Sequence, residues 1–195
     1  MPDTPPDRPT PRARLLQAAD RLFYEEGICT VGVDRILAEA DVARASLYTA
    51  YGSKDALVSA YLRSRSINWQ AMIAELLPTR WATPRDRILG IFELLTEWFT
   101  APGYRGCPFI NASAETTPDA AVSEVRDQHR AWVRDLFAAL GRDAGAADPE
   151  ALADELVLLY DGSMVGAQLD HSPNPGLAAS RAAAAVIDAA TARGS

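Results

Sequence analysis

Residues Val33–Leu57 decide the fold and read VDRILAEADVARASLYTAYGSKDAL. Apolar residues recur in this stretch at spacings of three and four. This pattern predicts two short amphipathic helices, one from near Val33 to Ala40 and one from about Arg44 to Tyr51. The connection between them is Asp41-Val42-Ala43. So short a connection between two helices is typical of a helix-turn-helix, whose second helix can enter the major groove of DNA.

The side chains of these two helices divide into an inner and an outer set. Apolar residues occupy the positions where two steeply crossing helices must meet: Ile36, Ala40, Val42 and Leu47. Of these, Val42 lies in the connection and is expected to point inward. The outward positions of the second helix are small or can form hydrogen bonds: Arg44, Ala45, Ser46, Tyr48 and Thr49. Such a surface suits a helix that contacts base edges and phosphates.

The pair is flanked by further helical segments. An amphipathic helix is expected before it, from about Arg12 to Glu26, with Gly27 ending the helix. Residues 1–11 contain five prolines and no periodic apolar pattern, and we expect them to form a disordered tail. After the pair, Ser53 is expected to cap a long helix that runs from Lys54 into the seventies.

The remainder of the chain also has a helical pattern. A capping residue followed by proline occurs at Thr83-Pro84, Thr117-Pro118 and Asp148-Pro149. These starts and the apolar periodicity predict helices over residues 84–99, 109–115, 118–140, 149–168 and 177–191. Gly141 is expected to end the helix over 118–140. There is no convincing strand pattern, so the predicted fold class is all-α.

The charge balance differs along the chain. The formal net charge is −7, yet residues 1–65 contain nine acidic and nine basic residues, so the acidic excess falls on residues 66–195. A neutral N-terminal part can bind DNA through one local face, while an acidic remainder opposes non-specific adhesion. The two cysteines, Cys29 and Cys107, make a poor disulfide framework. With no secretory signal or membrane-spanning run in view, we expect a cytoplasmic protein.

Residues 12–60 resemble the tetracycline-repressor (TetR) family of transcriptional regulators. The resemblance rests on the first amphipathic helix ending in Glu-Gly and on the segments VDRILAEADV, ASLYTAY and GSKDAL. It implies a three-helix DNA-binding domain over residues 12–57 and a larger helical domain over 58–195 that binds an effector and dimerises. The implied partners are a palindromic double-stranded DNA operator, a small-molecule effector and a second copy of the chain. No cofactor, metal or membrane is implied.

The resemblance also implies a set of DNA-contacting residues: Arg44, Ala45, Ser46, Tyr48, Thr49, Tyr51 and Lys54. Tyr48 and Lys54 would hold phosphates, Lys54 from the start of a helix whose free N–H groups also attract anions. Arg44 and Ser46 would contact phosphate or base.

The other members of this set have different roles. Ala45 and Thr49 would face base edges, and Tyr51 would mostly pack. This sequence departs from the family pattern at Asp41, where glycine is usual in the turn, and at Ala50, where histidine is common. Aspartate tolerates left-handed backbone geometry better than most residues, so the turn remains possible.

An effector cavity needs aromatic and apolar walls with a few polar groups. The candidates are Trp69, Met72, Phe92, Phe99, Cys107, Phe109, Asn111, His129, Trp132, Tyr160, Met164 and Gln168. Each aromatic residue among them also fits plain core packing. Asn111, His129 and Gln168 are stronger candidates, because a polar side chain on an apolar face needs a partner. Cys107 lies in a Gly-Cys-Pro turn at a helix start, where a thiolate would be favoured, although a small buried residue is the simpler interpretation.

The last two helices are candidates for a dimer interface. Stripes of small residues let helices approach closely, and pairing this helix pair with its copy gives a four-helix bundle. The stripe residues are Leu152, Leu156, Leu159, Ser163, Gly166, Ala178, Ala182, Ala185 and Ala189. Core packing within one subunit would produce a similar pattern.

These features predict a DNA-binding transcriptional regulator, a repressor that a small-molecule effector releases from its operator, and not an enzyme. One alternative is a helical interaction or sensor module whose DNA-reading head has weakened. Another is an enzyme with Cys107 as nucleophile and His129 as base. Neither a third orienting group nor an oxyanion site stands at a recognisable spacing to support that enzyme.

Overall fold

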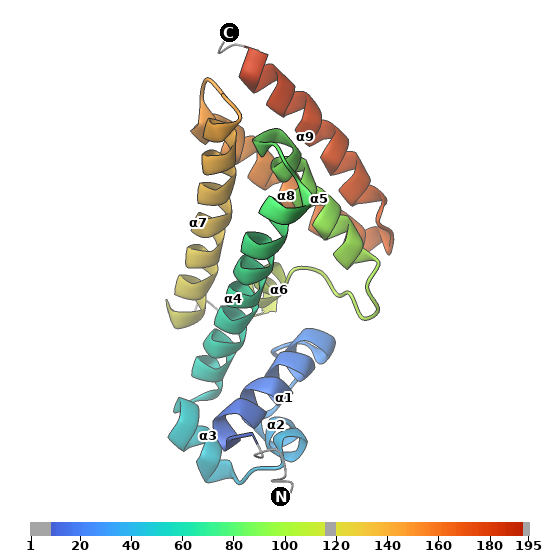
Figure 1. Ribbon diagram of the computed structural model, residues 1–195. Helices are drawn as coiled ribbons and strands as arrows, with labels where there is room; N and C mark the ends of the chain where they lie inside the picture. The colour runs from blue at the N-terminus through green and yellow to red at the C-terminus, as the bar shows by residue number, and fades with distance from the viewer. Residues whose placement is uncertain (1–8, 116–119, 193–195) are drawn as a thin grey trace, which may run out of the picture. The chain divides into compact units, whose positions relative to one another are not determined.

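The computed structural model describes residues 9–115 and 120–192, which form nine α-helices and no strand within these ranges (Figure 1). The predicted all-α fold class is confirmed. The chain divides into two compact units. Unit 1 contains the described parts of Met1–Ser64 and Asn111–Val125, and unit 2 contains Arg65–Ile110 and the described part of Arg126–Ser195.

Unit 1 begins with three helices, α1 (Pro11–Glu26), α2 (Val33–Ala40) and α3 (Arg44–Tyr51). Helix α1 packs against both α2 and α3. The apolar stripe of α1 meets the inner residues of the other two helices, which buries a compact core: Leu15, Ala19, Leu22, Phe23, Ile36, Ala40 and Leu47. Removal of these side chains from water drives the three short helices together.

The turn between α2 and α3 has a left-handed residue at the position where the family pattern has glycine. Asp41 has a φ of 50°. The N–H of Val42 donates to the Leu37 carbonyl at 3.2 Å, and the N–H of Asp41 donates to the Ala38 carbonyl at 3.3 Å. These two bonds satisfy carbonyls that the end of α2 would otherwise leave open. Val42 itself is half-buried.

Three helices follow along the chain. They are α4 (Lys54–Arg80), α5 (Pro84–Phe99) and α6 (Pro108–Glu115). The Ser53 hydroxyl accepts a backbone N–H at the start of α4 at 3.0 Å, and the Thr83 hydroxyl does so at the start of α5 at 3.1 Å. Both predicted caps are confirmed, and each satisfies a backbone donor that the helix itself leaves open.

The last three helices are α7 (Ala120–Asp143), α8 (Pro149–Asp170) and α9 (Asn174–Ala192). The Asp148 carboxylate accepts the N–H of Ala151, in the first turn of α8, at 3.0 Å, as predicted. The predicted start at Thr117-Pro118 lies outside the described residues. Helix α9 packs against α8 and α5, and these three helices lie together in Figure 1.

The predicted end of α7 at Gly141 is wrong. The helix continues to Asp143, and the left-handed residue that closes it is Gly145, with a φ of 83°. The N–H of Ala146 returns to the Gly141 carbonyl at 2.9 Å. Gly141 is instead a packing residue, because a Cβ there would lie 3.2 Å from the side chain of Leu152.

The predicted start of the last helix at residue 177 is also wrong, since α9 begins at Asn174. Gly176 lies one residue before that predicted start. It is buried in the first turn of α9, where an added Cβ would meet the side chains of Thr96 and Phe99. The glycine therefore lets α9 approach α5 closely and does not interrupt the helix.

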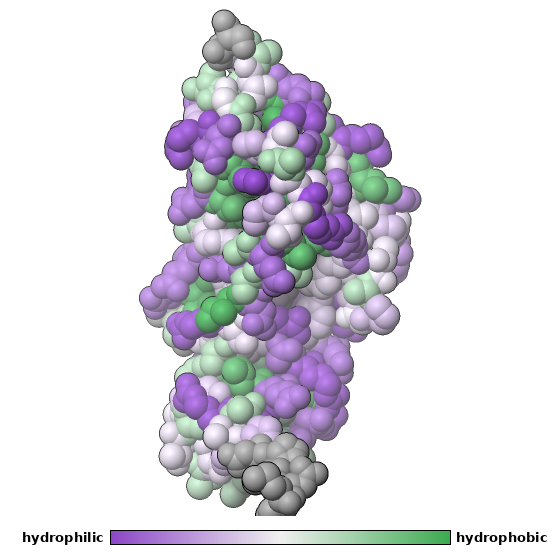
Figure 2. All heavy atoms as spheres, viewed as in Figure 1, coloured by the Kyte–Doolittle hydropathy of each residue, from purple (hydrophilic) through white to green (hydrophobic). Residues whose placement is uncertain are grey.

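The surface is of mixed character. On the face shown in Figure 2, hydrophilic residues cover much of the area and hydrophobic residues form separate patches. Across residues 9–115 and 120–192, no helix is both long and apolar enough to cross a membrane. In the same ranges, no cluster of three or more His, Cys, Asp or Glu residues is arranged to hold a metal ion.

Candidate DNA interface and effector cavity

Helix α3 has one buried face and one exposed face. Leu47 is fully buried and holds the helix against the core of unit 1. The exposed residues are Arg44, Ala45, Tyr48 and Thr49, of which Tyr48 is 50% exposed. Ser46 is half-buried. The structure thus brings most of the predicted DNA-contacting residues to one free helix surface.

The starts of α2 and α3 are not capped by side chains. Their N-cap residues are Gly32 and Ala43, neither of which has a side-chain acceptor. By contrast, Thr10, Thr83 and Asp148 cap α1, α5 and α8 with an oxygen. No cap side chain competes for the first-turn N–H groups of α2 and α3. At α3 this leaves them suited to an anion such as a phosphate, whereas α2 has the Asp34 carboxylate in its first turn.

Tyr51 ties the end of α3 to the start of α1. Its hydroxyl donates to the Arg12 carbonyl at 2.9 Å, and the Arg12 guanidinium lies 4.4 Å from the centre of the Tyr51 ring. The same guanidinium donates to the carbonyl of Ala50. Burial raises the pKa of Tyr51, and the Arg12 charge acts in the opposite direction. The packing role that the resemblance implied for Tyr51 agrees with these contacts.

Lys54 is half-buried at the start of α4. Its ammonium donates to the Ile28 carbonyl at 2.7 Å and lies 5.8 Å from the centre of the Phe23 ring. The side chain therefore fixes the loop between α1 and α2. An ammonium has three donors, so this contact leaves others for a phosphate.

Arg44 forms an ion pair that the sequence analysis missed. Its guanidinium pairs with the carboxylate of Asp34, in the first turn of α2. The side chains remain exposed, at 56% for Arg44 and 84% for Asp34. The opposite charges stand ten residues apart in the sequence. Only the short turn between the helices brings them together. The sequence feature that could have predicted the pair is the charged residue of opposite sign near the start of each helix.

Unit 2 contains a cavity of about 70 Å³ that gathers half of the predicted effector residues. The predicted members that line it are Trp69, Cys107, Phe109, His129, Tyr160 and Met164. The lining also includes residues that were not predicted: Arg65, Trp98 and Pro108. Trp98 was missed because the apolar pattern of α5 pointed to its neighbour Phe99. Arg65 was missed because an arginine in a long helix is usually a solvated residue.

His129 is the polar residue most firmly built into this cavity. Its Nδ1 lies 2.9 Å from the hydroxyl oxygen of Ser66, which accepts a hydrogen bond from the Gln70 amide at 2.9 Å. Because the Ser66 oxygen accepts from Gln70, the Ser66 hydroxyl can donate its own proton to Nδ1. This arrangement favours the tautomer of His129 that has its proton on Nε2. The ring stacks on Phe109 with centroids 3.9 Å apart. Burial lowers the pKa of His129 to about 4, so it is neutral at pH 7.

Cys107 and Tyr160 are also neutral at pH 7. Burial raises the pKa of the Cys107 thiol to about 11, although the backbone N–H groups of Ile110 and Phe109 act in the opposite direction. This result favours the interpretation of Cys107 as a small buried residue over that of a thiolate. Burial also raises the pKa of Tyr160 well above its ordinary value, against a hydrogen bond from Trp69.

The remaining effector candidates lie apart from this lining. Phe92 is fully buried and stacks on Phe137, with centroids 6.0 Å apart. Phe99 and Gln168 line a separate, more open groove of about 650 Å³. Trp132 is near the cavity, 6.0 Å from the His129 ring. Two more candidates are only half-buried and line neither space: Met72 and Asn111.

The predicted dimer residues fall into two groups. Three are buried within the chain itself: Leu152, Leu156 and Ser163. The others are half-buried or exposed: Leu159, Gly166, Ala178, Ala182, Ala185 and Ala189. Helix α8 also exposes apolar side chains that were not predicted: Leu158, Val165 and Leu169.

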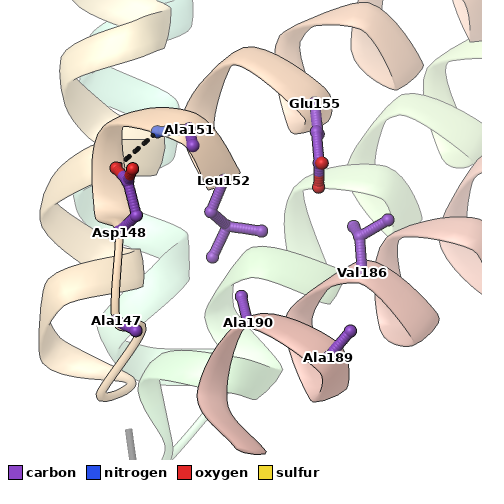
Figure 3. Close-up of a pocket in the computed structure, with 8 residues that line it drawn as sticks. All are labelled: Ala147, Asp148, Ala151, Leu152, Glu155, Val186, Ala189 and Ala190. Atoms are coloured by element: carbon purple, nitrogen blue, oxygen red, sulfur yellow. Dashed lines mark hydrogen bonds between the residues drawn. The ribbon is translucent and has the colours of Figure 1, made fainter. Parts of the chain in front are cut away.

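A pocket of about 210 Å³ lies between the start of α8 and the end of α9 (Figure 3). Figure 3 shows Leu152 and Glu155 of α8 on one side and Val186 and Ala190 of α9 on the other. Small side chains at this end of the two helices leave the space open. It brings together Leu152 and Ala189, two of the predicted dimer residues.

The helices α1, α2 and α3 form a three-helix head. This head, with α3 exposed, defines a helix-turn-helix DNA-binding protein. Residues 15–61 match a family described as "Bacterial regulatory proteins, tetR family". A TetR-family transcriptional regulator from Streptomyces coelicolor has a solved structure that is 32% identical in sequence, with a TM-score of 0.84 over 93% of this chain and 96% of that chain. The chain belongs to the TetR family of transcriptional regulators.

Two further relatives are named as repressors. The HTH-type transcriptional repressor DhaR of Mycobacterium sp. is 26% identical over 172 residues, or 84% of this chain and 85% of DhaR. The HTH-type transcriptional repressor NemR of Escherichia coli is 30% identical over 105 residues, or 53% of each chain. The structure of reduced NemR superposes with a TM-score of 0.80 at 25% identity, over 89% of this chain and 94% of NemR. TetR-family regulators are not enzymes, so the alternative of a Cys107–His129 enzyme is set aside.

Proposed function

We propose that this chain is a cytoplasmic transcriptional repressor that leaves its DNA operator when a small-molecule effector binds within unit 2. One combination of features carries the proposal: a polar, exposed α3 surface in unit 1 and an aromatic cavity of about 70 Å³ in unit 2. The names of DhaR and NemR support repression as the sign of regulation. On this proposal residues 12–57 read DNA and residues 58–195 sense the effector and dimerise.

The proposed DNA contacts are those of the exposed α3 surface and its flanks: Arg44, Ala45, Ser46, Tyr48, Thr49, Tyr51 and Lys54. The uncapped start of α3 adds backbone N–H groups for phosphates. Tyr51 contributes by holding α3 against α1. Thr49 and Ala45 are small enough for the helix to approach the base edges closely.

The proposed effector is a small molecule held in the His129 cavity. The cavity has room for roughly five water-sized groups. Its walls are aromatic, and its polar groups are the neutral imidazole of His129, the phenol of Tyr160 and the guanidinium of Arg65. Such a lining binds a compact, partly apolar ligand and fixes it through a few hydrogen bonds.

Two helices are suited to couple effector and DNA, because each contributes residues to both units. Helix α4 carries Lys54 at its start and the cavity residue Trp69 further on. Helix α6 carries Phe109 at its start, and the backbone oxygen of Glu115 at its end accepts a hydrogen bond from the Cys29 thiol at 2.6 Å. In this proposal the protein has a state that binds DNA and a state that does not. The effector shifts the equilibrium between them only through its different affinities for the two states.

We also propose a homodimer formed through α8 and α9. The apolar side chains that the chain leaves exposed on these helices include Leu158 at 72%, Leu169 at 73%, Val165 and Leu177. Leu158, Val165 and Leu169 are spaced by seven and four residues, so they share one face of α8. A two-fold axis would place the two heads on half-sites about 34–36 Å apart.

A charge introduced on this face tests the dimer. Leu158→Asp should shift the protein from dimer to monomer in sedimentation velocity, because it would place a carboxylate in an apolar interface. Ile67→Asp is the matched control, since Ile67 is 58% exposed on α4 outside the proposed interface. Equal dimer content in the two variants would reject α8 as the interface.

The repressor proposal is tested by selection of sheared genomic DNA from the source organism with the purified full-length protein at low salt. Enriched fragments should share a palindromic sequence and lie upstream of genes. Individual candidate metabolites added to the complex should then release the fragment, as measured by fluorescence anisotropy. If no fragment is enriched, the chain is an interaction or sensor module. If fragments are enriched but no metabolite releases them, the effector part of the proposal fails.

A further inference from the structure

We infer that Arg44 reads a guanine in each half-site and that Asp34 is the positioning residue that orients it. The inference rests on the proposed docking of α3 in the major groove and specifies what one of its residues recognises. It starts from the ion pair between Arg44, the first residue of α3, and Asp34, in the first turn of α2.

A carboxylate on a DNA-facing surface needs an explanation. Asp34 is 84% exposed and stands at the start of α2, one of the two uncapped helix starts of the head. The phosphate backbone repels such a charge, and an arginine that only neutralises phosphate is weakened by a paired carboxylate. The pair is therefore a poor phosphate clamp.

The same pair is well suited to base recognition. A guanidinium has five N–H donors in a rigid planar fork, so a carboxylate can occupy one edge while another edge remains free. Guanine presents two acceptors in the major groove, N7 and O6, which match that free edge. Asp34 limits the directions that the exposed Arg44 side chain can take. This reduces the conformational entropy that Arg44 loses when it binds a base.

The other bases do not match this edge. Adenine has an N6 amino donor where guanine has the O6 acceptor, so the guanidinium would meet a donor. The cytosine paired with the guanine offers an N4 amino donor, which suits a nearby carboxylate such as Asp34. A G·C pair is thus the one that satisfies both side chains. The small residue Ala45, next to Arg44, lets the start of α3 lie close to the bases.

Among the described residues, two further cations of the DNA-binding domain have contacts to backbone carbonyls. Arg14 donates to the Ala40 carbonyl at 2.9 Å and to the Asp41 carbonyl at 2.7 Å. Lys54 donates to the Ile28 carbonyl. Arg44 is the cation that the reading helix itself presents at its exposed start.

The experiment compares operator selection and affinity for the full-length wild type and four variants, Arg44→Ala, Arg44→Lys, Asp34→Ala and Asp34→Asn. Affinities are measured for the selected operator and for the same operator with the conserved G·C pair changed to A·T. Both substituted positions are exposed, so we expect thermal melting curves like that of the wild type. Arg35→Ala is the charge-matched control, since Arg35 pairs with Glu26 and Glu39 away from α3.

We expect the wild-type motif to contain one guanine per half-site that the Arg44→Ala motif lacks. The wild type should prefer the G·C operator by about ten- to hundredfold. Arg44→Ala should lose this preference, and Arg44→Lys should keep only part of it, because an ammonium still donates to guanine but lacks the planar fork that Asp34 orients. The two Asp34 variants should bind unrelated DNA more tightly, because a negative charge is removed, yet show a smaller preference for the G·C operator. Arg35→Ala should keep the full preference.

Two outcomes would overturn the inference. In one, the Arg44 variants bind all sequences more weakly by the same factor, which would make Arg44 a phosphate contact. In the other, the Asp34 variants keep the full G·C preference, which would make Asp34 an electrostatic bystander. Both outcomes require a wild type that binds DNA. Absence of any DNA binding by the wild type would instead reject the proposed function.

Discussion

The two units of this molecule place their candidate sites in opposite environments. In unit 1, most of the residues proposed to contact DNA lie on the exposed face of α3, while the core behind them is formed by other side chains such as Leu47. In unit 2, the residues proposed to contact the effector, such as Phe109 and His129, are themselves buried. A surface site can change with little effect on folding, whereas a site made of core residues cannot. Function and stability should therefore separate in unit 1 and change together in unit 2.

The largest expected effect comes from the cavity. Phe109→Ala removes a buried ring that stacks on His129, and it should lower the free energy of unfolding by about 3–5 kcal/mol. The measurement is chemical denaturation followed by circular dichroism. Tyr48→Ala on α3 is the control, and it should change stability by less than about 1 kcal/mol while weakening DNA binding. Equal losses of stability in Phe109→Ala and Tyr48→Ala would contradict the expected difference between the two units.

The next effect is a pH dependence due to His129. Burial lowers its pKa from 6.5 to about 4, so between these values the unfolded chain binds a proton that the folded chain does not. The stability that neutral His129 contributes is complete above pH 6.5 and is lost as the pH falls toward 4, by about 3 kcal/mol in total. The test is the difference in unfolding free energy between the wild type and His129→Gln from pH 7 to pH 4. A difference that does not change with pH would place His129 in a solvated environment.

A smaller effect is expected at the DNA surface. Thr49→Ala should leave stability unchanged and reduce the preference at one base pair per half-site by about 1–3 kcal/mol, because Thr49 is proposed to contact a base edge. Binding measurements on operators with single base changes give this preference. Identical preferences in the wild type and the variant would remove Thr49 from base reading.

The smallest effect concerns Lys54, which has a structural contact within the protein and a proposed contact to DNA. Its hydrogen bond to the Ile28 carbonyl contributes about 1 kcal/mol to stability, and its proposed phosphate contact contributes to DNA affinity. Lys54→Ala should lower affinity equally for all sequences and reduce the slope of log affinity against log salt by about 0.9 per contact. Arg134→Ala on α7 serves as a control of equal charge. The same slope for Lys54→Ala and the wild type would leave Lys54 with its structural role alone.

The sequence predicted local features of the fold well, because they depend on neighbouring residues. The caps at Thr83 and Asp148 are of this kind. The end of α7 was predicted less well, since Gly141 and Gly145 both fit a helix end by residue type. The structure distinguishes them, because Gly145 has the left-handed backbone and Gly141 packs against Leu152.

The candidate sites were predictable only in part. Apolar periodicity identifies the buried face of a helix but not the partner that buries it, so Leu152 and Leu156 were proposed for a dimer interface although they are buried within the chain. The exposed Leu158 breaks the expected pattern, and no local rule distinguishes it from a core leucine. The pairing of Arg44 with Asp34 depends on the crossing of two helices, which the order of residues does not specify.

Lys54 is the sole lysine of the 195-residue sequence, and its ammonium is proposed to lie between the protein and a phosphate. Amine-reactive reagents that acylate lysine will therefore find one internal target in this chain. An operator bound at the head should shield that target. The rate of acylation at a single position, followed by mass spectrometry, thus offers a direct readout of operator occupancy without a fluorescent label or an engineered residue.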